Sequence, residues 1–129
     1  MTYLLDSDWV ADYLKGRESA VAIVDSLYSA GLAISIITYA EVYEGIYYGR
    51  DRTRYERVFR EFLRGVDVLG INQRVARRFA IVRGMLRAQG QLISQTDLLI
   101  AATALEHDLI MVTRNVRDFG RVPDLQLHR

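Results

Sequence analysis

Short apolar runs alternate along the chain with longer stretches of helical periodicity, and this alternation constrains the fold more than any other feature. Apolar runs of this length suit strands buried on both faces. Strands separated by helices form parallel pairs with right-handed crossovers. The pattern therefore predicts a three-layer α/β/α domain with a central parallel sheet. We expect strands at 3–6, 32–36, 66–71 and 109–113, and helices at 8–15, 18–30, 38–48, 51–64, 73–89 and 95–107.

The length and composition narrow the class of protein. A chain of 129 residues suits one domain, 1–129. It contains no stretch near the roughly 20 apolar residues of a membrane-spanning helix, and its start lacks the pattern of a signal peptide, which predicts a cytoplasmic protein. There are no cysteines and only two histidines. Disulfides, thiolate nucleophiles and Cys-based zinc sites are excluded, and histidine-driven catalysis is not expected.

Charge is distributed unevenly. Residues 1–49 carry two basic and seven acidic residues, whereas residues 50–87 carry eleven arginines against four acids. Arginine binds phosphate through a planar, bidentate fork, so the second segment favours an anionic partner. A solvated helix face, or pairing with the acidic first third, explains the arginines equally well.

Three carboxylates lie where a parallel α/β sheet places its ligands. Asp6 closes the first expected strand, Glu41 lies about one turn into the helix after the second, and Asp97 lies at the start of the last long helix. Ligands of open parallel sheets bind beyond the carboxyl ends of the strands. These acids are therefore candidates for an active site.

Helix capping is the ordinary alternative for each acid taken singly. Thr38 and Glu41 have the spacing of a capping box, Ser94 and Asp97 form a similar start signal, and Asp6 could cap the first helix. Capping does not explain the apolar setting of Asp6 and Asp97. Clustered buried acids imply a bound cation, and oxygen-only ligands suit Mg²⁺ or Mn²⁺ rather than zinc. Such a metal beside an arginine-rich surface indicates phosphodiester hydrolysis.

At these residues the chain resembles VapC-type toxins, PIN-domain ribonucleases of bacterial and archaeal toxin–antitoxin pairs. The motifs that carry the resemblance follow the family's order at residues 4–8, 38–45, 90–102 and 112–119. The resemblance implies a PIN fold, an acidic site for one or two Mg²⁺ or Mn²⁺ ions, and cleavage of an RNA substrate. It also implies a homodimer and a cognate antitoxin that obstructs the site.

The same resemblance assigns roles to individual residues. Asp6, Glu41 and Asp97 match the catalytic and metal-binding acids. Where many relatives have a fourth aspartate after the last strand, this chain has Asn115, with Asp118 three residues later. We expect both to support the metal. The alternative for Asp118 is a surface acid that pairs with Arg114 or Arg121.

Aromatic residues on two neighbouring helices suggest a partner surface. Core packing is their ordinary explanation, but paired amphipathic helices also form grooves for a partner helix, which the resemblance assigns to the antitoxin. We expect RNA or antitoxin contacts at Arg87, Arg114, Tyr43, Tyr47 and Phe59. Two other functions remain open: an RNA-processing nuclease without an antitoxin, and a catalytically inactive RNA-binding or regulatory module.

Overall fold

The computed structural model describes all 129 residues and has a four-stranded parallel sheet at its centre. The strand order is β3-β2-β1-β4. This confirms the predicted α/β class and its central parallel sheet, with every expected strand present. The strands are Tyr3–Leu5 (β1), Leu32–Ser35 (β2), Val66–Leu69 (β3) and Ile110–Val112 (β4).

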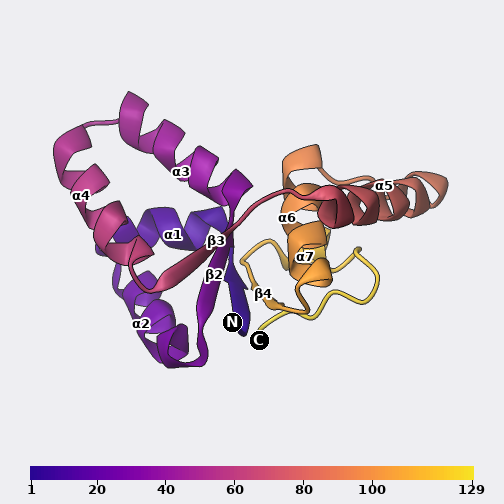
Figure 1. The fold of residues 1–129 in the computed structure, drawn as a ribbon, viewed down its shortest axis with the longest axis horizontal. Helices are drawn as coiled ribbons and strands as arrows, with labels where there is room; N and C mark the ends of the chain where they lie inside the picture. Colours follow the sequence, from indigo (N-terminus) through magenta and orange to yellow (C-terminus); the bar gives the residue numbers. More distant parts are fainter.

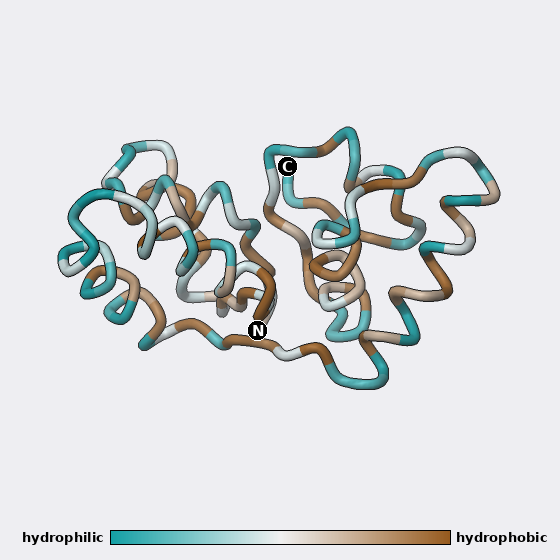
Figure 2. Tube along the Cα trace, turned by 90° about the horizontal axis from the view of Figure 1, so that it is seen from above, coloured by the Kyte–Doolittle hydropathy of each residue, from teal (hydrophilic) through white to brown (hydrophobic).

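Helices form a layer on each face of the sheet (Figures 1 and 2). Successive side chains of a strand point to opposite faces, so Leu5 packs into a core beneath α1–α4, and Leu4 packs into a second core beneath α5–α7. None of the helices has the length and apolarity needed to cross a membrane. The helices are Ser7–Leu14 (α1), Glu18–Leu27 (α2), Tyr28–Ala30 (η1, a 3-10 turn), Ile36–Tyr48 (α3), Arg52–Leu63 (α4), Gln73–Ala88 (α5), Gln95–Glu106 (α6) and Val116–Phe119 (α7).

Two elements differ from the prediction in ways that matter for the site. Helix α3 begins two residues early because the hydroxyl of Ser35 accepts a hydrogen bond from the backbone N–H of Ile37. The buried Thr38 therefore lies inside the helix, and its capping box with Glu41 does not form. Strand β3 is not buried on both faces, because it lies at the edge of the sheet; Val68 is 39% exposed.

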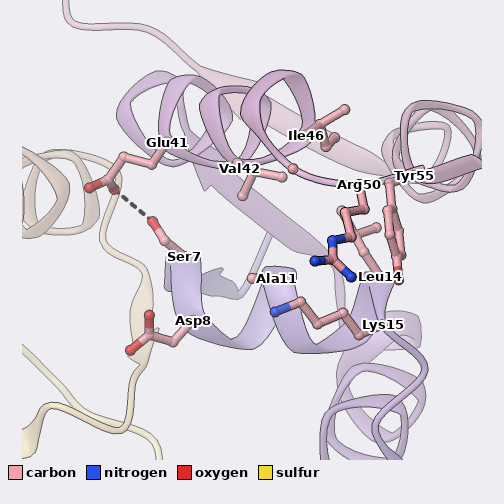
Figure 3. Close-up of a pocket in the computed structure, with 12 residues that line it drawn as sticks. Ser7, Asp8, Ala11, Leu14, Lys15, Glu41, Val42, Ile46, Arg50 and Tyr55 are labelled. Atoms are coloured by element: carbon pink, nitrogen blue, oxygen red, sulfur yellow. Dashed lines mark hydrogen bonds between the residues drawn. The ribbon is translucent and has the colours of Figure 1, made fainter. Parts of the chain in front are cut away.

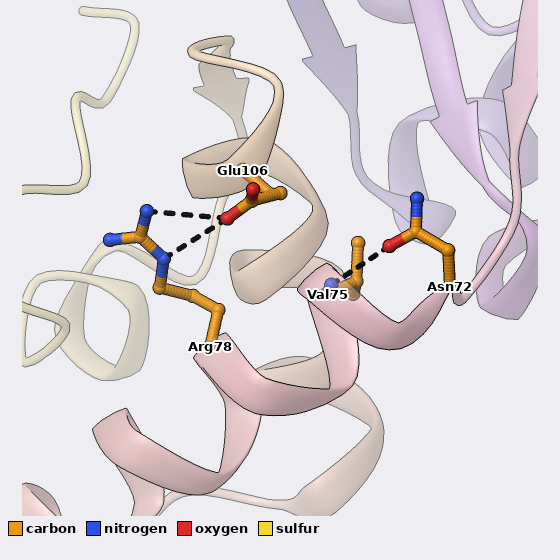
Figure 4. A network of polar contacts seen from close by, with 4 residues as sticks. All are labelled: Asn72, Val75, Arg78 and Glu106. Atoms are coloured by element: carbon orange, nitrogen blue, oxygen red, sulfur yellow. Dashed lines mark hydrogen bonds and ion pairs between the residues drawn. The ribbon is translucent and has the colours of Figure 1, made fainter.

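Helix α5 carries five of the eleven arginines of residues 50–87, and it packs along α6 (Figure 4). The side chain of Asn72 begins the helix by accepting a hydrogen bond from the N–H of Val75 at 2.9 Å. One turn later, Arg78 donates to Glu106 of α6 at 3.2 and 3.3 Å. This exposed ion pair contributes little stability. The alanines of α6, Ala101 and Ala104, let the two helices approach closely in the core.

The two ends of the chain lie beside each other at the amino ends of the strands (Figure 1). The rings of Tyr3 and His128 meet edge to face with centroids 5.5 Å apart. The terminal segment also pairs with β4, since the N–H of His128 donates to the carbonyl of Met111 at 2.8 Å. The carboxyl ends of the strands, where the acids lie, are at the opposite edge of the sheet.

Candidate active site

Four aspartates come together at the carboxyl edge of the sheet. Burial is the largest cause of the raised pKa of Asp6 and of Asp97. The charges of Asp97 and Asp8 add to it for Asp6, and those of Asp118 and Asp8 add to it for Asp97. The four aspartates come from three separate parts of the chain: the junction of β1 and α1, the first turn of α6, and α7. The fold therefore brings together Asp6, Asp97 and Asp118 as the sequence suggested, and adds Asp8.

Asp6 is buried and held at both oxygens. Its Oδ1 accepts the backbone N–H of Ser7 at 2.8 Å, which caps α1, and its Oδ2 accepts the hydroxyl of Thr113 at 2.7 Å. Burial raises the pKa of Asp6, and the two hydrogen bonds only partly oppose this rise. The predicted capping role of Asp6 is confirmed, and burial keeps its pKa raised despite the two hydrogen bonds.

Asp97 is half-buried in the first turn of α6. The hydroxyl of Ser94 caps the helix by accepting the backbone N–H of Asp97 at 3.2 Å, which confirms the start signal seen in the sequence. Burial is the largest cause of its raised pKa, the Ser94 hydroxyl opposes it, and the charges of Asp118 and Asp8 add to it. Asp97 is therefore a second partly buried carboxylate with a raised pKa, and its charge acts on Asp6.

Glu41 joins the site through a serine rather than directly. The hydroxyl of Ser7 donates to Oε1 of Glu41 at 2.8 Å (Figure 3). It also lies 3.1 Å from the hydroxyl of Thr38. Because the backbone N–H of Ser7 also binds Asp6, one residue fixes two acids relative to each other. The glutamate itself is exposed.

Asn115 and Asp118 form a pair beside Asp97. The side-chain amide of Asn115 donates to Oδ2 of Asp118 at 3.1 Å, and its backbone N–H donates to the hydroxyl of Thr113 at 2.9 Å. The amide carbonyl oxygen of Asn115 has no partner in the structure. The alternative ion pairs of Asp118 do not form, because Arg114 binds Asp12 and Arg121 donates to a backbone carbonyl.

Sequence reasoning missed three contributors, Ser7, Asp8 and Thr113. Each had a positional signal, because Ser7 and Asp8 follow Asp6 directly and Thr113 closes β4 at the edge where ligands bind. The hydrogen bond between Thr113 and Asp6 joins residues 107 positions apart, so its existence depends on the register of β1 and β4.

The donor set suits a divalent cation in its chemistry. As the side chains stand, no three acids or histidines are close enough to hold one ion together. Burial raises the pKa of the buried Asp6 and of the half-buried Asp97, and a hard, oxygen-binding cation nearby would favour their charged forms. The roles of these residues as metal ligands and catalytic groups stay a prediction.

The aromatic residues expected to contact a partner fall into different environments. Phe59 is fully buried in the core beneath α1–α4, so its predicted partner contact is wrong. Tyr43 is half-buried, and its hydroxyl donates to Glu56 at 2.6 Å. Tyr47 is 50% exposed, with the guanidinium of Arg52 lying 4.2 Å over one face of its ring, so it is the most accessible of these three aromatic residues.

The two arginines of that prediction also differ. Arg114 donates to Asp12 at 2.7 Å and lies 3.9 Å over the ring of Trp9, so internal contacts already hold its guanidinium. Arg87 is exposed in the last turn of α5 and makes no ion pair. Of the two, only Arg87 is free to contact a partner without breaking an existing interaction.

Comparison with known proteins gives a family match and full-length relatives. The family model described as "PIN domain" matches residues 3–125. A Haemophilus influenzae protein named "Ribonuclease VapC1" is 30% identical over 128 residues, covering 98% of this chain and 96% of the relative. A Shigella flexneri protein named "tRNA(fMet)-specific endonuclease VapC" is 28% identical over 126 residues, with the same coverage.

Solved structures give the same picture. VapBC2 from Rickettsia felis, bound to a DNA fragment from its promoter, matches with a TM-score of 0.90 and 25% identity, covering 99% of this chain and 98% of that chain. VapBC-1 from nontypeable Haemophilus influenzae matches with a TM-score of 0.86 and 29% identity, covering 99% and 97%. The folds correspond from end to end.

Proposed function

The chain belongs to the PIN-domain family, and on that premise we propose that it is an endoribonuclease, the toxin of a type II toxin–antitoxin system, that hydrolyses phosphodiester bonds in RNA. The observation that carries the proposal is the placement of Asp6, Asp8, Asp97 and Asp118 on elements that meet at the carboxyl edge of the sheet, with Asp6 buried and hydrogen-bonded by Ser7 and Thr113. Full-length relatives named as VapC ribonucleases support the substrate class.

The proposed cofactor is Mg²⁺ or Mn²⁺. Asp6 and Asp97 would hold it, with Glu41, Asp118 and the carbonyl oxygen of Asn115 supporting it. When bound, the ion lowers the pKa of water and stabilises the charge that develops on a phosphate. The protein's own contribution is to hold Asp6 by two hydrogen bonds and to orient Glu41 through Ser7.

The proposed protein partners are a cognate antitoxin and a second copy of the chain. The antitoxin is supported by the solved neighbours, which are VapBC complexes. An RNA-processing nuclease without an antitoxin, or an inactive RNA-binding module, would have the same fold. Cleavage of RNA excludes the inactive module, and toxicity on expression that a co-expressed neighbouring protein relieves excludes the housekeeping nuclease.

The test is Asp97→Asn, which removes charge from the site and hardly changes volume. Purified protein should cleave RNA in Mg²⁺ or Mn²⁺, and Asp97→Asn should lower the rate at least a hundredfold, the scale of losing a group that stabilises transition-state charge. Asp25→Asn, at an exposed position on α2, is the matched control and should cleave normally. Normal cleavage by correctly folded Asp97→Asn would contradict the proposal.

A further inference from the structure

A groove leads away from the acidic site between α1 and α3, and it ends near the start of α4 (Figure 3). Its volume is about 530 Å³, within the range of small-ligand sites. Ser7, Asp8 and Glu41 lie at one end, and Lys15 and Arg50 lie at the other. The groove therefore has an acidic end that belongs to the candidate active site and a basic end that the site has not used.

The basic end offers two unengaged cations. Lys15 and Arg50 are both exposed, and neither forms an ion pair in the structure. Lys15 directly follows α1, whose first two residues lie at the acidic end. With a rise of about 1.5 Å per helical residue, the two ends are separated by roughly 11 Å along α1. A short segment of single-stranded nucleic acid spans this distance.

The middle of the groove is apolar. Its surface is formed by Ala11, Leu14, Val42, Ile46 and Tyr55. RNA-binding proteins use apolar and aromatic surfaces of this kind against unstacked bases, while nearby basic groups bind the phosphates. An RNA strand carries a phosphate at every nucleotide. A strand whose cut phosphate lies at the acids therefore places a base over the apolar floor and further phosphate charge at the two cations.

Gly45 lies on the wall of this groove, inside α3, where the fold does not require a glycine. Its φ is not positive, and an added Cβ would meet no atom within 4 Å. Glycine inside a helix is unfavourable relative to most residues. The neighbouring Gly49 differs, because a Cβ there would lie 2.6 Å from the carbonyl oxygen of Gly45. Backbone packing explains Gly49, whereas Gly45 has no such reason and faces open space on the groove wall.

We propose that this groove binds the RNA segment next to the bond that is cut. Lys15 and Arg50 each contact a phosphate of that segment, a base packs on the apolar floor, and Gly45 leaves room for the base. This inference rests on the proposed function and gives the RNA substrate a path across the surface of the protein. A protein segment is the competing occupant, and the tests below separate it from RNA.

The first test measures binding rather than cleavage. An unstructured, fluorescently labelled RNA of ten nucleotides is titrated with protein carrying Asp97→Asn, so that the probe stays intact. Adding Lys15→Gln and Arg50→Gln should raise the Kd about tenfold at low salt, and should reduce the slope of log K against log salt by about 1.4, the effect of two lost phosphate contacts. Arg57→Gln with Arg129→Gln removes the same charge outside the groove and should change the slope less.

The second test fills the groove. Gly45→Leu replaces glycine with a better helix former, so the melting temperature should not fall, yet RNA binding should weaken about tenfold through loss of one packed base. Gly84→Leu is the matched control, because Gly84 is also exposed inside a helix with no atom within 4 Å of an added Cβ, and it lies outside the groove. It should bind RNA normally.

The outcomes distinguish this inference from the proposed function. If the groove variants keep the parental Kd and salt slope while wild-type protein still cleaves RNA, the groove proposal is overturned and the ribonuclease proposal stands. The groove then belongs to a protein partner. If wild-type protein cleaves no RNA but the groove variants still lose binding, the ribonuclease proposal fails and RNA binding in the groove stands.

Discussion

The two aspartates that anchor the candidate site, Asp6 and Asp97, are held in opposite ways. Asp6 is 7% exposed, and both of its oxygens accept hydrogen bonds, from Ser7 and from Thr113. Asp97 is half-buried, and its backbone N–H, rather than its carboxylate, takes part in the cap of α6 by donating to the hydroxyl of Ser94. One acid is therefore part of the connection between strands, whereas the other is available to a ligand.

The difference follows from the hydrophobic core beside which each acid lies. Asp6 follows Leu5, which packs into the core beneath α1–α4, and Asp97 precedes Leu98, which packs into the core beneath α5–α7. The candidate site therefore lies on the boundary between the two helical layers. The arrangement of its acids depends on how both layers pack on the sheet. The acid beside the α1–α4 core is held by hydrogen bonds, and the acid beside the α5–α7 core is available to a ligand.

The largest expected effect comes from truncating the two acids in parallel. Asp6→Ala removes a helix cap and leaves the buried hydroxyl of Thr113 without its acceptor, so the free energy of unfolding should fall by about 2 kcal/mol. Asp97→Ala should change it by no more than about 0.5 kcal/mol, because it relieves repulsion while losing a favourable first-turn charge. Urea denaturation in chelator measures both. Equal losses of stability would contradict the comparison.

A second prediction tests the Asp6 side through its partner. Thr113→Val keeps the shape but removes the donor to Asp6 and the acceptor for Asn115, so the free energy of unfolding should fall by about 1.5 kcal/mol. Thr113→Ser retains the hydroxyl and should recover most of that loss. A valine variant as stable as wild type would mean that this hydrogen bond does not hold the carboxylate.

The third prediction concerns Asp118 on the Asp97 side. Asp118→Ala should leave stability nearly unchanged, reduce cleavage less than Asp97→Asn, and raise the Mg²⁺ or Mn²⁺ concentration for half-maximal rate, because a charge that faces Asp97 is lost. Asp118→Asn keeps the shape and should show the same shift. A metal titration of the initial rate measures the change. An unchanged titration would assign Asp118 to pairing with Asn115 alone.

The smallest effect is a dependence on pH. Burial raises the pKa of Asp6 and Asp97 in the folded state, so protonation favours the folded state and stability is lost as pH rises from about 4 through their raised pKa values. In chelator, the melting temperature of Asp97→Ala should therefore rise relative to that of wild type as pH increases from about 4 to 7. Asp12 has a lowered pKa, so its contribution is lost only at lower pH and does not obscure this trend. A difference that stays flat with pH would contradict it.

The sequence predicted the main elements because periodicity is a local property. It could not predict α7, whose four residues are too few to show a period, nor the exposure of β3, whose apolar run resembles an interior strand. Phe59 shows the same limit. An amphipathic helix has an apolar face, but whether a ring on that face meets the core or a partner depends on what packs above it.

The candidate site divides in a similar way. The carboxyl-edge rule selected Asp6, Glu41 and Asp97 because strand ends can be read from the sequence. Their hydroxyl partners depend on distant contacts: Ser7 reaches Glu41 across 34 positions, and Thr113 reaches Asp6 across 107. Such contacts are decided by strand register and helix placement, which no local pattern encodes.

The adjacent chain ends bear on how this protein can be handled. Both termini lie at the amino edge of the sheet, and the acids lie at the carboxyl edge (Figure 1). A biosensor tether, an affinity tag or a fluorophore at either end therefore points away from the site and the groove. A short linker between the ends would close the chain into a circle without touching the acidic edge of the sheet.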